Sequence, residues 1–85
     1  MTTNATPTGT QIGIMVHEIL VRQMKEDPQG TTISSGIILP TIADHGFSDD
    51  HELLVEGPAE EIWGQYLKGG IIDPVAHAAD AIRDA

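Results

Sequence analysis

The residues best suited to chemistry lie together between Asp44 and Glu52, in the segment DHGFSDDHE. Imidazole nitrogens and carboxylate oxygens are suitable ligands for divalent cations. If this segment binds a metal, His45, Asp49 and His51 are the best candidate ligands. The segment lacks the Asp/Asn alternation and terminal Glu of a helix–loop–helix calcium site. We therefore favour a simpler interpretation, a capped helix junction with a solvated acidic face.

Other residues that could support catalysis do not form a diagnostic pattern. A zinc protease helix needs a second His four residues after the first, but the position four residues after His17 is Val21. Nucleophilic catalysis needs Ser, Thr or Cys beside a base, and the spacing of the serines and histidines does not indicate such a pair. Gly69-Gly70 lacks the flanking residues of a phosphate-binding loop. We expect a protein that is not an enzyme and has no cofactor.

The acidic charge of the chain is its strongest global feature. The sequence has 13 acidic and 4 basic residues, a formal net charge of -9. No Lys or Arg occurs from Glu26 to Leu67, a stretch that holds many of the carboxylates. A surface of one sign disfavours contact with DNA phosphates or with anionic membranes. It favours a basic protein partner, a cation or simple solubility.

Length and composition limit the class of protein. A chain of 85 residues forms one small domain, and its three aromatic residues leave a mainly aliphatic core. Cysteine is absent, which excludes disulfides and thiolate metal sites. Small domains with thin cores often gain stability from assembly. No apolar run approaches the ~20 residues of a membrane span, and no secretory signal is recognisable. We expect a location in the cytoplasm or within a viral particle.

The residues discussed above must be positioned by helices. Three segments predict firm helices, namely residues 10–26, 58–68 and 73–84. Apolar residues recur at helical spacing in the first, and Thr10 can cap it. The second is expected to begin at Pro58, directly after Gly57, because proline suits the first helical position. Asp73 and Pro74 predict the cap and first residue of the third helix.

The stretch after the first helix is ambiguous. Residues 31–39 contain Thr, Ile and Ser in a pattern that suits a short strand, although Ser35 could instead cap a helix. Pro40 would lie awkwardly inside such a helix. We expect an extended segment to residue 39, followed by a short helix with Pro40 in its first turn. Gly46 is then expected as a left-handed C-cap, with Phe47 folded back onto the helix.

The remaining segments complete the predicted organisation. Residues 48–56 indicate a short capped helix, with a strand over Leu53–Val55 as the alternative, and Gly57 ends either one. Residues 1–9 are polar and predict a flexible arm. Residues 10–85 then form a single helical domain. The expected fold is mainly α, a small bundle of three firm helices with one or two short elements.

Aromatic and acidic side chains are the candidates for an interface. Trp63 and Tyr66 lie one turn apart on a predicted helix, and such residues often anchor interfaces. In so small a protein the core is their more natural place. The interface candidates are Trp63, Tyr66, Glu60, Glu61, Asp49, Asp50 and Glu52.

The sequence thus favours a non-enzymatic protein-interaction or assembly module, either a homo-oligomer or a partner of another protein. The acidic, cysteine-free composition with a polar arm has the general look of a small phage or mobile-element protein. A virion structural or adaptor subunit would be one such module. The alternative is an acidic inhibitor that mimics nucleic acid and binds a basic surface. A third hypothesis is a small module stabilised by a metal.

Overall fold

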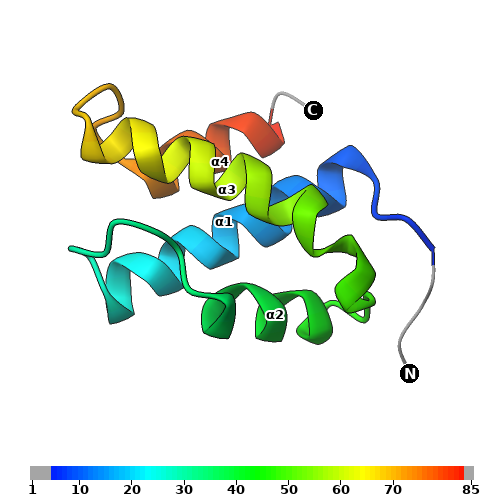
Figure 1. The fold of residues 1–85 in the computed structure, drawn as a ribbon. Coiled ribbons are helices and arrows are strands. Elements are labelled where there is room, and N and C mark those ends of the chain that lie inside the picture. Colours follow the sequence, from blue (N-terminus) through cyan, green and yellow to red (C-terminus); the bar gives the residue numbers. More distant parts are fainter. Residues whose placement is uncertain (1–4, 84–85) are drawn as a thin grey trace.

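Helices account for all the regular structure in residues 5–83, the part of the chain that the computed structural model describes (Figure 1). Their bounds are α1 Gly9–Glu26, α2 Ser35–Asp44, η1 Asp49–His51, α3 Glu52–Leu67 and α4 Pro74–Arg83, with η1 a short 3-10 helix. No strand occurs in this part of the chain. The predicted mainly α fold is confirmed, with four α-helices among the described residues where three firm ones were expected.

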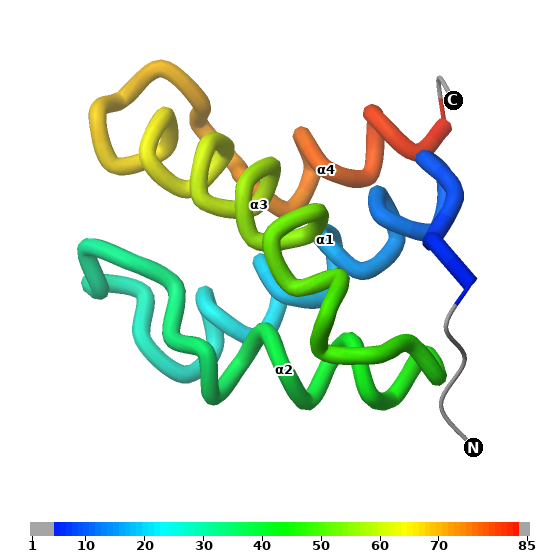
Figure 2. The backbone as a smooth tube through the Cα atoms, turned by 45° about the vertical axis from the view of Figure 1, so that its right-hand side comes forward, coloured from blue at the N-terminus to red at the C-terminus, as the bar shows by residue number. Residues whose placement is uncertain are grey.

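Consecutive α-helices run in opposite directions, and α1 lies between the other three (Figures 1 and 2). α1 packs against α2, α3 and most extensively α4. The start of α1 and the end of α4 lie side by side at one edge of the molecule (Figure 2). The loop between α3 and α4 and the end of α1 lie at the opposite edge.

α1 begins slightly earlier than the sequence predicted because its cap is Thr8 and not Thr10. The Thr8 hydroxyl accepts a hydrogen bond from the Gln11 amide at 3.1 Å. The Gln11 side chain in turn accepts one from the Thr8 amide at 2.8 Å, which completes a capping box. The cap thus satisfies two amides that the first turn of a helix leaves without partners.

α2 corrects the prediction for residues 31–39, where the expected strand does not form. The helix starts at Ser35, and the Ser34 hydroxyl caps it by accepting a hydrogen bond from the Gly36 amide at 3.0 Å. Pro40 therefore lies inside the helix, where it removes one backbone hydrogen bond. Burial of the apolar face outweighs that loss. The buried residues of α2 are Ile37, Ile38, Thr41 and Ile42.

The end of α2 follows the prediction. Gly46 has a φ of 80°, and its amide donates to the Ala43 carbonyl at 2.9 Å. The Phe47 amide donates to the Ile42 carbonyl at 3.1 Å, and the Phe47 side chain is buried. These bonds form a Schellman motif, so the glycine C-cap and the folded-back aromatic ring are confirmed.

α3 corrects the prediction that Gly57 separates two helices. The helix runs through Gly57 and Pro58 without a break, joining the predicted short helix to the predicted helix 58–68. Val55, Ala59 and Trp63 recur every four residues on its buried face, and each has 0% exposure. Pro58 is exposed, so water can solvate the one carbonyl that it leaves without a helical partner.

The turn between α3 and α4 agrees with the sequence interpretation. Gly69 has a φ of 83°, and the Gly70 amide donates to the Gln65 carbonyl at 2.8 Å. The Asp73 carboxylate accepts hydrogen bonds from the amides of Val75 and Ala76, at 3.0 and 3.1 Å. The predicted glycine stop of α3 and the predicted Asp73 cap of α4 are therefore confirmed.

The predicted arm falls partly outside the described residues, because residues 1–4 are not among them. Pro7 is buried, and Thr8 and Gly9 are the cap and first residue of α1. Residues 84–85, where the last helix was expected to end, also lie outside the described part. None of the described helices combines the length and apolar character that a bilayer-spanning segment requires.

Candidate functional site

His45 lies at the end of α2 and faces α1. Its Nε2 atom is 3.1 Å from the Glu18 carboxylate. Beside it, Arg22 donates to the Asp44 carboxylate at 2.8 Å and to the Thr41 hydroxyl at 3.0 Å. The hydrogen bond to Asp44 raises the pKa of Arg22. These contacts join α1 to α2, so His45 has a structural partner in the fold.

The other two candidate metal ligands are placed differently. Asp49 is the first residue of η1, and the His51 ring packs edge-on against Phe47 with centroids 6.5 Å apart. Among residues 5–83, no three His, Cys, Asp or Glu side chains are grouped so that they could hold one metal ion. The arrangement gives no support to a metal site formed by His45, Asp49 and His51.

Glu52 and Glu56 form a like-charged pair one turn apart at the start of α3. A hydrogen bond with the Glu56 carboxyl is the largest cause that raises the pKa of Glu52 above its ordinary value of 4.5. Loss of hydration raises this pKa further, and so does electrostatic repulsion from Glu56 and Asp49. The folded chain therefore holds a proton on Glu52 more tightly than the unfolded chain does.

Replacing Glu52 with glutamine is expected to stabilise the protein at about pH 7, where the repulsion is fully present. As pH falls through the raised pKa, Glu52 takes up its proton in the folded state and the repulsion disappears. The stability difference from wild type should therefore shrink on acidification and vanish only well below the ordinary pKa of 4.5, where Glu52 is protonated in both states. Thermal unfolding at a series of pH values measures this difference. Glu61→Gln, which removes an exposed carboxylate elsewhere on α3, is the control.

Trp63 and Glu60 act inside the fold. Trp63 has 0% exposure, and its indole N–H donates to the Gly30 carbonyl at 2.8 Å. The Glu60 carboxylate accepts a hydrogen bond from the Ile33 amide at 2.6 Å. Both side chains thereby fix the loop between α1 and α2 against α3. In this fold Trp63 has no surface to offer a partner.

The remaining interface candidates keep some exposure. Tyr66 is half-buried, with its ring centroid 5.1 Å from that of Trp63. Glu52 is also half-buried, whereas Asp49, Asp50 and Glu61 are exposed. The acidic candidates can thus meet a partner, although they do not surround one cavity.

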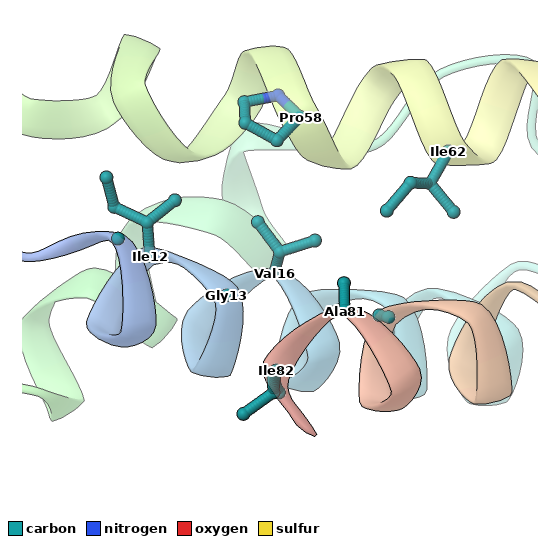
Figure 3. A pocket seen from close by; sticks show the side chains of 9 residues that line it. Ile12, Gly13, Val16, Pro58, Ile62, Ala81 and Ile82 are labelled. Carbon is teal, nitrogen blue, oxygen red and sulfur yellow. The ribbon is translucent and has the colours of Figure 1, made fainter. Parts of the chain in front are cut away.

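A groove that sequence analysis missed lies between α1, α3 and α4. It has a volume of about 220 Å³ and is open on one side. Figure 3 shows Pro58 and Ile62 of α3 opposite α1 and α4, with Ile62 pointing toward Ala81. We call this feature the apolar groove. Its lining includes Ile12, Gly13 and Val16 of α1, Pro58 and Ile62 of α3, and Ala81 of α4.

Small residues create the apolar groove. A Cβ atom on Gly13 would lie 3.2 Å from the Ile82 side chain, so glycine allows α4 to lie close against α1. Ala78 and Ala81 have small side chains on the side of α4 that lines the groove, and α3 lies opposite them. The alanines of the last helix were a visible signal of close packing. The hollow itself depends on how three helices cross, which their periodicity does not specify.

The chemistry available in the apolar groove is that of an apolar host. Its lining side chains carry no ionisable or hydroxyl group, so it can bury a hydrocarbon group but cannot move a proton. Other apolar side chains lie exposed outside it. Leu53 is 77% exposed near the start of α3, and Ile72 is 95% exposed in the loop before α4.

Comparisons with models of protein families, with curated proteins and with solved structures found no match to this chain.

Proposed function

We propose that this protein is a non-enzymatic protein-interaction module that binds a segment of another polypeptide through the apolar groove. One observation carries the proposal: the apolar groove is a hollow of about 220 Å³ lined by hydrocarbon side chains and glycine. A hollow of this kind suits an apolar anchor residue, the type of contact that dominates many protein interfaces. An assembly or adaptor role, in a virion or elsewhere, is a use to which such a module can be put.

The shape of the apolar groove supports a side chain as its occupant. An apolar cavity of about 150 Å³ can hold a benzene molecule, so this volume suffices for one branched or aromatic side chain. The groove is too small for an extended substrate, and no polar group of its lining would orient one. Amphipathic helices commonly dock into apolar grooves through one such anchor.

The test uses amphipathic helical peptides of about 14 residues, or four turns, with leucines on one face. One peptide is neutral, one is rich in lysine and one is rich in glutamate. We expect the neutral peptide to shift the amide resonances of Gly13, Val16 and Ile62 in the isotope-labelled protein. Ala81→Arg should weaken this binding at least about ten-fold, because it places a charge over the apolar groove.

Ala43→Arg is the matched control. Ala43 and Ala81 are both exposed and lie in the last turn of ten-residue helices, so arginine has a similar effect on the helix dipole at either site. Ala43→Arg should leave peptide binding unchanged. If none of the peptides shifts these resonances, or if both variants lose binding equally, the proposed role of the apolar groove is wrong.

An acidic inhibitor of a basic surface is the second candidate function. The observation that favours it is the exposed position of Asp49 and Asp50 beside the mutually repelling Glu52 and Glu56. Basic side chains placed here would relieve that repulsion. This function requires that only the lysine-rich peptide binds, and that its affinity falls steeply as salt screens the charges.

A further inference from the structure

We propose that the occupant of the apolar groove is the Ile72 side chain of a second copy of this chain, in a head-to-tail contact. The inference rests on the proposed docking role of the apolar groove and names its partner. Ile72 is 95% exposed, the most exposed of the large apolar residues in the described chain. An apolar protrusion and an apolar hollow are therefore present in the same molecule.

The loop that carries Ile72 is held at both ends. Before it, the amides of Gly70 and Ile71 donate to the Gln65 carbonyl, at 2.8 and 3.3 Å. After it, the Asp73 carboxylate caps α4. A side chain presented on a loop held in this way loses less conformational freedom on binding than one on an unrestrained loop.

The protrusion and the hollow lie at opposite ends of α4. Ile72 precedes the first residue of α4, whereas Ala81 and Ile82 of the apolar groove belong to its last turn. Ten helical residues span about 15 Å, so a molecule cannot insert Ile72 into its own groove. The contact must join two molecules, and it leaves one free protrusion and one free groove at the ends of the pair. Such a contact repeats and gives an open chain or a closed ring.

The overall charge of the chain weakens this contact. Two copies of net charge -9 repel each other. The two ends do not carry opposite charges: Asp73 follows Ile72 in the loop, and the exposed Arg83 follows Ile82 of the apolar groove but pairs with Asp80. Salt screens the overall repulsion, so self-association should strengthen as salt increases, opposite to the response of a basic partner.

The experiment combines two variants that each lack one half of the contact. Ile72→Glu removes the protrusion and keeps the groove, whereas Ala81→Arg blocks the groove and keeps the protrusion. Each site is exposed, so neither change disturbs the core. A contact centred on one aliphatic side chain is weak, with a dissociation constant on the order of 1 mM, so concentrated samples are used.

Isotope-labelled Ile72→Glu is mixed with unlabelled Ala81→Arg, and we expect shifts at the amides of Gly13, Val16 and Ile62. The shifts should grow between about 50 mM and about 500 mM sodium chloride. The partner variant Ala81→Arg/Leu53→Glu, which changes a different exposed apolar residue, should produce the same shifts. The partner variant Ala81→Arg/Ile72→Glu should produce none.

Absence of shifts in the first mixture, or shifts with the partner that lacks Ile72, would overturn the inference. If the peptides bind in the preceding experiment but the two variants do not bind each other here, the apolar groove is a docking site for a different protein. If neither experiment shifts the groove resonances, the apolar groove is not a docking site. If Ala81→Arg proves unfolded, Ala81→Trp fills the groove with an apolar ring and serves as the blocked partner in its place.

Discussion

Replacing Trp63 with alanine is expected to lower the free energy of unfolding by about 3–5 kcal/mol. The side chain has 0% exposure, and its removal leaves a cavity among α1, α3 and the loop before α2. It also removes the indole N–H, which in the wild-type protein donates to the Gly30 carbonyl at 2.8 Å. A chain of 85 residues has a total stability of about 4–13 kcal/mol, so this single change should approach global unfolding.

Urea denaturation followed by far-ultraviolet circular dichroism measures the loss. Trp63→Phe separates the two contributions, since it keeps most of the apolar volume and removes the hydrogen bond to Gly30. It should cost about 1–3 kcal/mol, the penalty for a partly buried carbonyl that loses its partner. A Trp63→Ala protein with the wild-type midpoint would contradict the central role of this residue in the core.

Replacing Ile42 with alanine is expected to cost about 2–5 kcal/mol. Ile42 has 0% exposure and lies in the last turn of α2, where its carbonyl also accepts the Phe47 amide. The smaller side chain leaves a cavity beneath the turn that folds Phe47 onto the helix. The backbone hydrogen bond remains, so the effect should come from lost packing.

Ile72→Ala is the matched control, because the same atoms are removed from a side chain that is 95% exposed. At low protein concentration it should change stability by no more than about 0.5 kcal/mol. Chemical denaturation of both variants in parallel measures the contrast. Equal losses at the two sites would mean that burial does not govern the stability of this domain in the way the structure implies.

Helix ends were the most predictable part of the fold. Gly46, Gly69 and Asp73 each supply a backbone or side-chain geometry that few other residues provide, so their local sequence is sufficient. The two prolines that lie inside helices were misleading. Pro40 and Pro58 each remove one hydrogen bond, which argues locally for a helix boundary. Both helices continue because the buried residues on either side of each proline share one face.

The signal for continuity through Pro58 was present in the sequence. Val55, Ala59 and Trp63 have helical spacing across the expected break, and a longer window would have found it. The apolar groove could not be found in this way. It arises because Gly13 brings α4 close to α1 while Pro58 and Ile62 stand opposite, a result of three-dimensional packing. The acidic residues were easy to notice, but the exposure of each depends on the fold.

The packing of α1 against α4 has a consequence for how the protein is made. A ribosome completes α1, α2 and α3 before the residues of α4 emerge. Until then the side of α1 that α4 covers, around Gly13, lacks this neighbour. The newly made chain thus carries an uncovered apolar seam until α4 emerges. The short, alanine-rich α4 covers that seam once it has emerged.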